Sequence, residues 1–372
     1  MDEHERGCWA AVNRVPGVGP ARVRRLLSRF GTLAGAWSAP AVDLAGAGIE
    51  RRVVDGLLAL RARTSPAAEL EQAQRAGARV LTWLDEDYPA RLATIPDPPP
   101  VLYVRGTLLA QDERAVAVVG TRRPTYYGRS LAVRLCEAFA GAGVCVVSGL
   151  ARGIDTQAHR GALGAGGRTL AVLGHGPDTV YPPENGRLAG QIAGAGALLT
   201  EYPPGTGPEA QNFPPRNRII SGLGAGVLVI EAGTQSGALI TCRYAGDQGR
   251  DVFAVPGPVT SPASDGCHRL IQDGAKLVRE AADVLDELFP PFPVAPAAPG
   301  GPPPWQMALD LDEPDGDLLR AILDHGGPAG VDSLARSLAR PVQEVTGALA
   351  RLELEGRVRH VGGMRFVIHP AQ

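Results

Sequence analysis

The sequence predicts an α/β protein whose main domain is a doubly wound parallel sheet covered by helices. Between residues 115 and 280, apolar segments alternate with segments of helical periodicity. The apolar segments are continuous rather than alternating, which indicates strands buried on both faces, as in a parallel sheet. A chain of 372 residues is also too long for one ordinary domain, so we expect two or three domains.

The main domain is expected to span residues 66–289 and to have an extended, Rossmann-like sheet. Its parallel strands are predicted from seven apolar runs, at residues 115–119, 144–147, 169–173, 197–200, 227–230, 252–255 and 276–278. Residues 82–84 and 101–104, on either side of a Pro-rich segment, are expected to add two strands and to extend the sheet.

The first 65 residues are expected to form a separate helical domain. Apolar residues recur at helical spacing on both sides of a Pro-Gly-Val-Gly-Pro turn at residues 16–20, which is typical of a helix-hairpin-helix or sterile-alpha-motif-like unit. Glycine N–H groups in such a hairpin can bind DNA phosphate. Nearby arginines would add positive charge: Arg22, Arg24, Arg25 and Arg29. A small packing domain with solvated arginines explains the same residues equally well.

The C-terminal part is expected to comprise a linker, residues 290–309, and a winged-helix-like domain, residues 310–372. The linker is rich in Pro, Ala and Gly. Three helical segments and a hairpin turning at Gly362-Gly363 follow it. The third helix is mainly acidic, which favours a protein-contact or dimer-support role over duplex binding. Arg357 and Arg359 in the wing keep DNA binding open.

Composition excludes several classes of protein. No apolar run reaches the roughly 18–20 residues that span a bilayer, and the charged N-terminus has no apolar region after it, so we expect a soluble, cytoplasmic protein without membrane contact. The five cysteines show no zinc spacing, which predicts reduced thiols and no metal site. Lys276 is the only lysine and does not lie in a Walker A motif, which excludes a P-loop ATPase.

Two Gly-rich loops are candidates for binding an anion. They follow the first and second parallel strands, at residues 120–128 and 148–155, and both contain arginine. Glycine lets the backbone approach an anion, and N–H, hydroxyl and guanidinium groups donate to it. Neither loop is GxGxxG, and Ser148-Gly149 stands where a nicotinamide enzyme has an acidic residue, so no dinucleotide cofactor is expected. Tight packing explains one such loop well but two loops with arginines poorly.

A third candidate segment is residues 211–220. Arg216 and Arg218 lie at an expected helix start, where cations oppose the helix dipole unless an anion binds between them. Phe213 could stack on an unpaired base. The alternative is that Phe213 belongs to the core and the arginines are ion-paired at the surface. After the next strand, Glu231 is expected either to orient an arginine or to cap backbone N–H groups.

Together these motifs resemble the DNA-processing protein A (DprA/Smf) family. The resemblance covers about residues 80–280 and is specific, because separate loops agree in order and spacing. The matching segments are Val118–Arg122, Ser148–Asp155, Phe213–Arg218, Glu231 with Ser236–Thr241, and Val255–Gly257. The terminal domains match the family's accessory domains much less specifically.

The resemblance implies a homodimeric protein of natural transformation that protects incoming single-stranded DNA and helps to load the RecA recombinase onto it. By carry-over from the motifs, the residues that fall in the DNA-binding pocket are Gly120, Thr121, Arg122, Ser148, Gly149, Arg152, Gly153, Phe213, Arg216, Asn217, Arg218, Ser236 and Gly237. DNA-binding pockets of this family often use Lys as well as Arg. Here Ala210-Gln211-Asn212 precede Phe213, so the rim has no lysine. This departure puts the contribution of the rim to DNA affinity in doubt. No cofactor and no catalytic residue are implied.

Two other classes of function compete with this interpretation. Related Rossmann-like folds cleave nucleotide N-glycosidic bonds, and four side chains could serve as acids or bases: Asp155, His159, His175 and Glu231. Each also has a structural interpretation, with Asp155 as a helix cap, His159 on a helix surface and His175 in a turn. The third class is an interaction scaffold in which the glycines serve packing alone.

Overall fold

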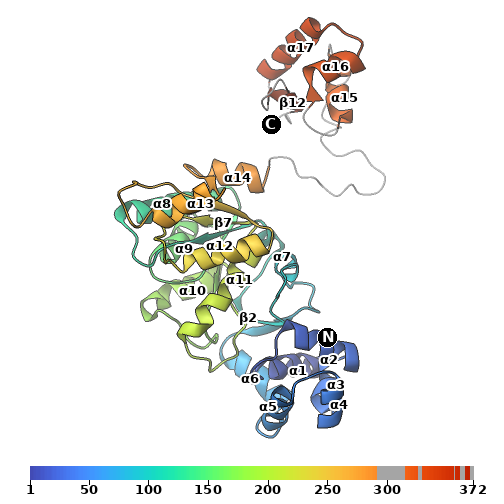
Figure 1. Ribbon diagram of the computed structural model, residues 1–372, viewed down its shortest axis with the longest axis vertical. Coiled ribbons are helices and arrows are strands. Elements are labelled where there is room, and N and C mark those ends of the chain that lie inside the picture. Colours follow the sequence, from blue (N-terminus) through green and yellow to red (C-terminus); the bar gives the residue numbers. More distant parts are fainter. Residues whose placement is uncertain (291–314, 326–328, 356, 361–364, 369–372) are drawn as a thin grey trace. The chain divides into compact units, whose positions relative to one another are not determined.

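The computed structural model describes residues 1–290, 315–325, 329–355, 357–360 and 365–368 (Figure 1). The chain divides into two compact units, Met1–Pro291 and Phe292–Gln372, each of which is described by itself. Apart from Pro290, the expected linker at residues 290–309 lies outside the described residues, as does the expected turn at Gly362-Gly363. Among the described helices, none combines the length and the hydropathy that crossing a bilayer requires.

The first unit is built on a nine-stranded sheet, which confirms the expected α/β class. Its order is β1-β2-β6-β5-β4-β3-β7-β8-β9. Strands β3 to β9 run parallel, and β1 and β2 add an antiparallel extension beside β6. The strands are β1 (Arg79–Thr82), β2 (Val101–Gly106), β3 (Ala115–Val119), β4 (Cys145–Ser148), β5 (Thr169–Val172), β6 (Ala197–Thr200), β7 (Gly226–Val229), β8 (Asp251–Ala254) and β9 (Lys276–Leu277).

Helices cover both faces of this sheet, as a doubly wound fold requires. Along β3, Ala117 and Val119 pack into one apolar cluster with α11 and α12, whereas Val116 and Val118 pack into another with α8 and α9. The helices of the sheet domain, with three short 3-10 helices, are α7 (Ala90–Ala93), η1 (Ala110–Glu113), α8 (Tyr126–Gly141), α9 (Ile154–Gly164), η2 (Pro183–Asn185), α10 (Gly186–Ala195), η3 (Ala210–Asn212), α11 (Phe213–Leu223), α12 (Ala238–Asp247), α13 (Asp265–Gln272) and α14 (Ala282–Leu288).

The N-terminus is helical, as expected. Its helices are α1 (Glu3–Asn13), α2 (Pro20–Phe30), α3 (Leu33–Ser38), α4 (Ala41–Gly46), α5 (Arg51–Arg61) and α6 (Pro66–Arg75). They share one apolar cluster, centred on the fully buried Trp9, which also includes Val101 and Tyr103 of β2. Helix α6 follows the boundary expected at residue 65 but contributes Ala73 to this cluster. The N-terminal helices therefore pack directly on the antiparallel extension of the sheet.

The strand expected at residues 82–84 is misplaced, because β1 ends at Thr82. A turn follows immediately, in which the Asp85 carboxylate accepts hydrogen bonds from the Thr82 amide at 2.7 Å and the Thr82 hydroxyl at 3.0 Å. The Asp85 amide donates to the Thr82 carbonyl at 3.1 Å. These local bonds compete with strand pairing and end the strand. The apolar residues Trp83 and Leu84, which suggested a strand, therefore lie in a turn.

The second unit is a winged helix, as expected. It contains α15 (Gly316–Asp324), β10 (Ala329–Gly330), α16 (Val331–Ser337), α17 (Val342–Leu354), β11 (Val358–His360) and β12 (Arg365–Ile368). The strands form a three-stranded sheet in the order β10-β12-β11. Its core contains Leu319, Leu334, Leu349 and Phe366.

Candidate nucleic-acid interface

The loops singled out in the sequence meet at the carboxyl edge of the parallel strands. Strands β3 and β7 are neighbours although they are far apart in the chain, so the strand order reverses between them, which is where doubly wound folds bind ligands. Backbone hydrogen bonds join the loops: the Thr121 amide donates to the Glu231 carbonyl at 2.7 Å, and the Ile154 amide donates to the Thr121 carbonyl at 3.1 Å. The Asn217 side chain donates to the Gly237 carbonyl at 3.4 Å.

The glycines of the first two loops are required by the packing of these loops on each other. A Cβ atom at Gly120 would lie 2.6 Å from the Ile154 side chain, and one at Gly153 would collide with the Thr121 carbonyl. Gly153 also has φ of +81°, which side-chain-bearing residues rarely adopt. Ser148 is buried and donates to the Val118 carbonyl at 2.7 Å. Tight packing therefore accounts for Gly120, Ser148 and Gly153.

Arg216 lies at the centre of the cluster as a buried guanidinium. Its side chain is 3 % exposed and donates to the carbonyls of Gly149, at 2.8 Å, and Val172. Burial and the nearby Arg122 lower its pKa to about 10, against the attraction of Asp155. Among the described residues, no group accepts from its Nε atom. The ends of β4 and β5 are thus linked through one guanidinium at the start of α11.

The carboxylate of Asp155 is the counter-charge in this buried centre. It accepts from the amides of Gly149 at 3.2 Å and Ala151 at 3.3 Å, which lie in the loop before α9. The expected helix-cap role of Asp155 is therefore wrong: Gly153 is the N-cap of α9, and Asp155 lies in its first turn and holds the preceding loop. Burial raises the pKa of Asp155 above its ordinary value, while Arg216 opposes that rise. A Cβ atom at Gly149 would lie 2.8 Å from both the Arg216 guanidinium and the Asp155 carboxylate. Glycine is therefore needed where the two side chains meet.

Phe213 is half-buried and lies close to two guanidinium groups. Its ring packs on Gly174, where a Cβ atom would lie 2.8 Å from the ring. The Cζ atoms of Arg122 and Arg216 lie 5.9 Å and 5.7 Å from the ring centroid, within the range of cation–π attraction. The ring of Tyr181 lies 5.8 Å away. Phe213 is therefore neither a core residue nor a fully exposed platform.

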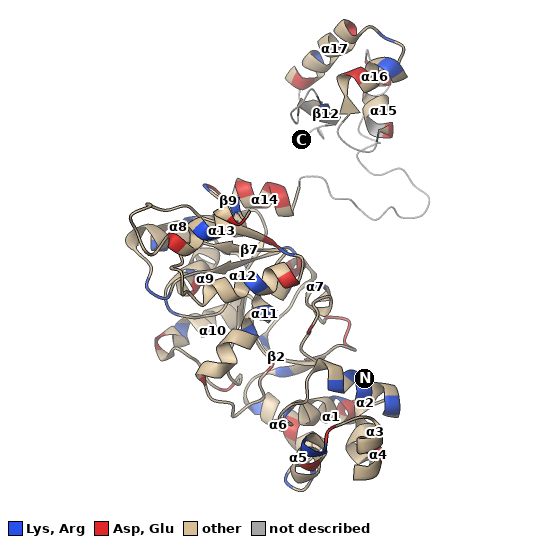
Figure 2. Cartoon of the chain, in the orientation of Figure 1, with Lys and Arg blue, Asp and Glu red and all other residues tan. Residues whose placement is uncertain are grey.

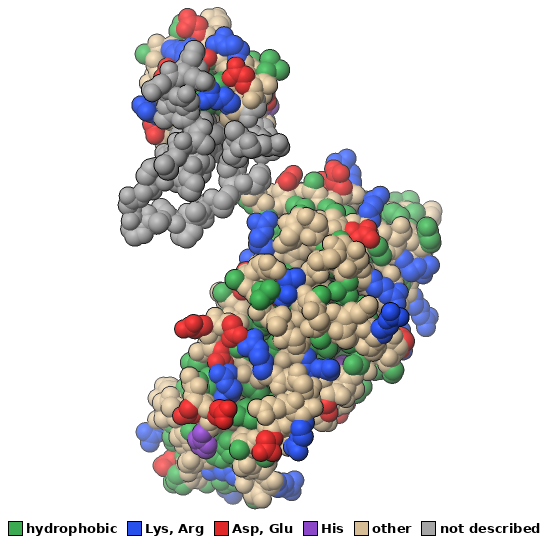
Figure 3. All heavy atoms as spheres, turned by 180° about the vertical axis from the view of Figure 1, so that it is seen from behind, with side chains coloured by type: hydrophobic (Ala, Val, Ile, Leu, Met, Phe, Trp, Pro, Cys, Tyr) green, Lys and Arg blue, Asp and Glu red, His purple; other side chains and the backbone are tan. Residues whose placement is uncertain are grey.

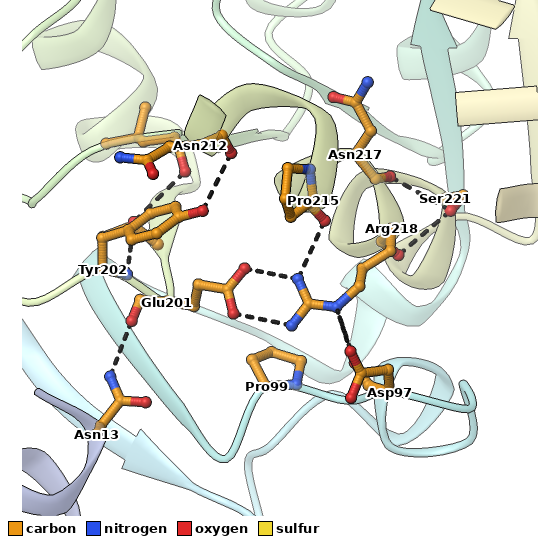
Figure 4. A network of polar contacts seen from close by, with 12 residues as sticks. Asn13, Asp97, Pro99, Glu201, Tyr202, Asn212, Pro215, Asn217, Arg218 and Ser221 are labelled. Atoms are coloured by element: carbon orange, nitrogen blue, oxygen red, sulfur yellow. Dashed lines mark hydrogen bonds and ion pairs between the residues drawn. The ribbon is translucent and has the colours of Figure 1, made fainter. Parts of the chain in front are cut away.

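Arg218 is held by the protein itself, although the motif places it beside Arg216. Figure 4 shows its guanidinium facing the Glu201 carboxylate, with which it makes two hydrogen bonds, at 2.5 and 2.8 Å. It also donates to the Asp97 carbonyl at 2.9 Å, and its side chain is 8 % exposed. Asn13 of α1 donates to the Glu201 carbonyl at 2.9 Å. Arg218 therefore ties α11 to the N-terminal helices.

The remaining site residues lie closer to solvent. Arg122 is exposed and makes no ion pair among the described residues, whereas the exposed Arg152 is paired with Glu184 at 2.5 Å. Thr121, Asn217 and Ser236 are partly exposed, and Gly237 is exposed. The four arginines predicted from the sequence therefore differ in the structure. Arg122 is exposed without an ion pair among the described residues, Arg152 is exposed and ion-paired, and Arg216 and Arg218 are buried.

The four candidate acids and bases serve structural roles. The expected position of His159 on a helix surface is wrong: the residue is fully buried, and its Nδ1 atom lies 2.7 Å from the hydroxyl of Thr169 on β5. Burial lowers the pKa of His159 to about 3 and also lowers the pKa of the buried His175. Glu231 accepts from the Thr125 amide and hydroxyl, both at 2.8 Å, so it satisfies a backbone N–H group and holds the residue that caps α8. Among the described contacts it orients no arginine.

Two residues near Phe213 were missed in the sequence. Gly174 lies two residues after the end of β5 and packs against the Phe213 ring, and the ring of Tyr181 lies beside that same ring. A glycine directly after the apolar run at residues 169–173 is a usable signal for Gly174, because the glycines at the ends of the first two parallel strands are candidates for the same reason. No local pattern marks Tyr181.

The arginines of the N-terminal hairpin are largely engaged within the chain. Arg22 pairs with Glu50 at 2.7 Å and donates to the Gly17 carbonyl at 2.6 Å, and Arg25 donates to the Gly48 carbonyl at 3.1 Å. The Cζ atom of Arg24 lies 5.1 Å from the centroid of the Trp83 ring. In Figure 2, acidic residues lie among the basic residues of these helices. These contacts favour the packing role over phosphate binding.

Comparison with known proteins gives a consistent set of relatives. Residues 79–289 match the family model described as DNA recombination-mediator protein A, and residues 297–364 match the model of the DprA winged helix domain. The chain is 37% identical to Protein Smf of Synechocystis over 98% of this chain and 99% of that protein. It is 48% identical to DNA processing protein DprA of Streptococcus pneumoniae over 55% of this chain and 72% of that protein.

Two solved structures are similar to this one. The X-ray structure of DNA processing protein A from Streptococcus pneumoniae matches with a TM-score of 0.67 and 38% identity, over 75% of this chain and 96% of that chain. A structure of DNA processing protein A from Helicobacter pylori matches with a TM-score of 0.52 and 29% identity, over 57% of this chain and 97% of that chain. The latter is described as giving insight into the single-stranded DNA binding mode of the Helicobacter protein.

Proposed function

Because the chain belongs to the DNA recombination-mediator protein A family, also called DprA/Smf, we propose that it binds single-stranded DNA at the carboxyl edge of its sheet. The observation that carries this proposal is the open guanidinium of Arg122 beside the half-buried Phe213 ring, above a buried arginine. A cation next to an aromatic ring provides the two contacts that unpaired nucleotides need, to phosphate and to base.

We assign different roles to the thirteen selected residues. Arg122, Phe213 and Asn217 contact the strand, together with the side chains of Thr121 and Ser236 and the backbone of Gly237. Arg152 contributes positive charge at the rim, where Glu184 holds it. The other six shape the site from below: Gly120, Ser148, Gly149, Gly153, Arg216 and Arg218. Their burial and their intrachain contacts support this division.

Arg122 also explains how the free protein keeps the site ready for a strand. Its exposed guanidinium lies over the Phe213 ring and makes no ion pair among the described residues. A base that stacks on the ring replaces this cation–π contact, and the displaced guanidinium then pairs with a phosphate. One residue thus protects the aromatic face in the free state and contributes charge in the bound state.

The protein acts without catalysis in this proposal. His159 and His175 are buried with lowered pKa values, Asp155 faces Arg216, and Glu231 is occupied by Thr125. None of the four is placed to take a proton from a substrate in water. The family resemblance further supports a role in loading RecA onto the bound strand during transformation, as a cytoplasmic homodimer. Light scattering tests the dimer, and RecA filament formation on coated single strands tests the loading.

Strand preference is the first test of the proposed function. Fluorescence anisotropy should give a much higher affinity, by at least tenfold, for an oligonucleotide in single-stranded form than for its duplex, because stacking on Phe213 requires unpaired bases. Equal affinity for both forms would contradict the site. Release of free nucleobase from a mononucleotide would instead support the N-glycosidic hydrolase.

A further inference from the structure

A second group of aromatic side chains lies at the same edge of the sheet, outside the proposed pocket. Tyr126 and Tyr127 begin α8, and their side chains are 80 % and 46 % exposed. Val259, in the loop after β8, is 86 % exposed. We call Tyr126 and Tyr127 the tyrosine patch. Single exposed apolar residues are common on protein surfaces, so the patch is informative only through its position and its charged surroundings.

The position of the patch is fixed by contacts to two strands on the far side of β3. Thr125, directly before Tyr126, is held by Glu231 at the end of β7. The Tyr127 hydroxyl donates to the Pro256 carbonyl, after β8, at 2.9 Å. The pocket is centred instead on the ends of β4 and β5, where Arg216 bonds to Gly149 and Val172, and only its rim at Ser236 and Gly237 reaches the loop after β7. Pocket and patch therefore occupy adjoining halves of one sheet edge.

Arg122 connects the two halves, since it extends from the loop between β3 and α8. From β5 to β8 the edge crosses four strand spacings, in the order β5-β4-β3-β7-β8, or about 19 Å. This length exceeds that of one nucleotide. If one nucleotide of a DNA strand is held at Phe213, the adjoining nucleotides of that strand must therefore lie along the edge.

The charge around the patch suits a polyanion. Arg122, Arg123 and Arg129 are exposed in the loop and in the first turn of α8, and residues 120–136 contain no acidic residue. Residues 256–263, which include Val259, are uncharged. Figure 3 shows basic side chains gathered with apolar ones along one side of the larger unit. Exposed rings among arginines form the surface on which unpaired bases stack without sequence preference.

We propose that the tyrosine patch is a second base-stacking site, on which single-stranded DNA continues after it leaves the pocket at Arg122. Tyr126 offers its exposed ring to a base, while Tyr127 is held in place by Pro256. Arg123 and Arg129 neutralise the phosphates on either side. This proposal rests on the proposed function, because it extends a strand whose first contacts are Arg122 and Phe213.

Oligonucleotides of two lengths distinguish the contribution of the tyrosine patch to binding from that of the pocket. Affinities are measured by anisotropy for oligothymidylates of about 5 and about 20 nucleotides, with wild-type protein, Tyr126→Ala and Tyr126→Phe. We expect Tyr126→Ala to weaken binding of the long oligonucleotide at least fivefold and to leave the short one unchanged, since the short one fills only the pocket. Tyr126→Phe keeps the ring and should restore the long-strand affinity.

Val42→Ala is the matched control, because Val42 is 74 % exposed on α4 and should affect neither length. Unchanged long-strand affinity in Tyr126→Ala would overturn the second site. An equal loss for both lengths would also overturn it, since Tyr126 would then belong to the pocket. If Phe213→Ala kept wild-type affinity for the short oligonucleotide, the pocket itself would be wrong, an outcome distinct from failure of the patch alone.

Discussion

Replacing Arg216 with alanine is expected to lower the free energy of unfolding of the larger unit by about 3 kcal/mol, because it leaves buried polar groups without partners. The guanidinium is 3 % exposed and bonds to the carbonyls of Gly149 and Val172. It also attracts the buried Asp155 carboxylate more strongly than Arg122 does. Single-strand affinity should fall as well, since α11 and Phe213 lose their support.

The size of this loss should depend on pH in a defined direction. Burial already raises the pKa of Asp155, and removal of Arg216 raises it further. An acid whose pKa is higher in the folded than in the unfolded state binds more protons when folded, so the folded state gains stability as the pH falls through the raised pKa. Arg216→Ala should therefore be most destabilised near neutral pH and above, and less so near about pH 5.

Urea unfolding at these two pH values tests this prediction. Arg160→Ala is the control, because Arg160 is exposed on α9 and its removal should change the free energy of unfolding by less than about 0.5 kcal/mol. An Arg216→Ala variant that unfolds at the wild-type urea concentration above neutral pH would show that the buried cluster does not support the fold.

Replacing Phe213 with alanine is expected to weaken single-strand binding by about 1–3 kcal/mol, the range for loss of a base–aromatic stack. The ring is half-buried on Gly174, so the same change should also cost about 2 kcal/mol of folding free energy, less than the 3–5 kcal/mol typical of a fully buried Phe. The two effects must be separated before the loss of affinity is assigned to stacking.

Two further variants at this position distinguish the loss of base stacking from the loss of folding stability. Phe213→Leu keeps apolar contact with Gly174 but has no aromatic face, so it should melt close to wild type and still bind weakly. Phe213→Tyr keeps the ring and should bind nearly as well as wild type. Thermal melts without DNA, followed by anisotropy titrations, compare the set. Wild-type affinity in Phe213→Leu would exclude stacking on this residue.

The sheet could be predicted from the sequence because its strands are continuous apolar runs. The ranges 115–119 and 197–200 agree with β3 and β6 at both ends. The antiparallel β1 was misplaced because its limit is set by a side chain, Asp85, that bonds back to Thr82. The pattern of apolar residues predicts which segments are buried, but it does not predict a local side-chain hydrogen bond that ends a strand.

The loops of the site could also be selected from the sequence, but the roles of their side chains could not. Arg122 and Arg216 look alike in the sequence, each beside small or polar residues. One is exposed and the other is buried, because the buried guanidinium meets Asp155 and the carbonyl of Val172, which come from other parts of the chain. The burial of His159 has the same cause, since its imidazole lies against Thr169 of β5, which comes from a later part of the chain. Only the tertiary packing decides these cases.

The salt dependence of single-strand affinity in wild-type protein and in Arg122→Ala tests the central claim most directly. Each lost phosphate contact should reduce the slope of log affinity against log salt by about 0.7, and the exposed guanidinium of Arg122 lies over the Phe213 ring, where the strand is proposed to bind. Arg52→Ala, an exposed arginine on α5, is the matched control and should keep the wild-type slope. We predict a slope smaller by about 0.7 and weaker binding in Arg122→Ala, with unchanged melting. Wild-type affinity and slope in Arg122→Ala would contradict the placement of the strand at this edge.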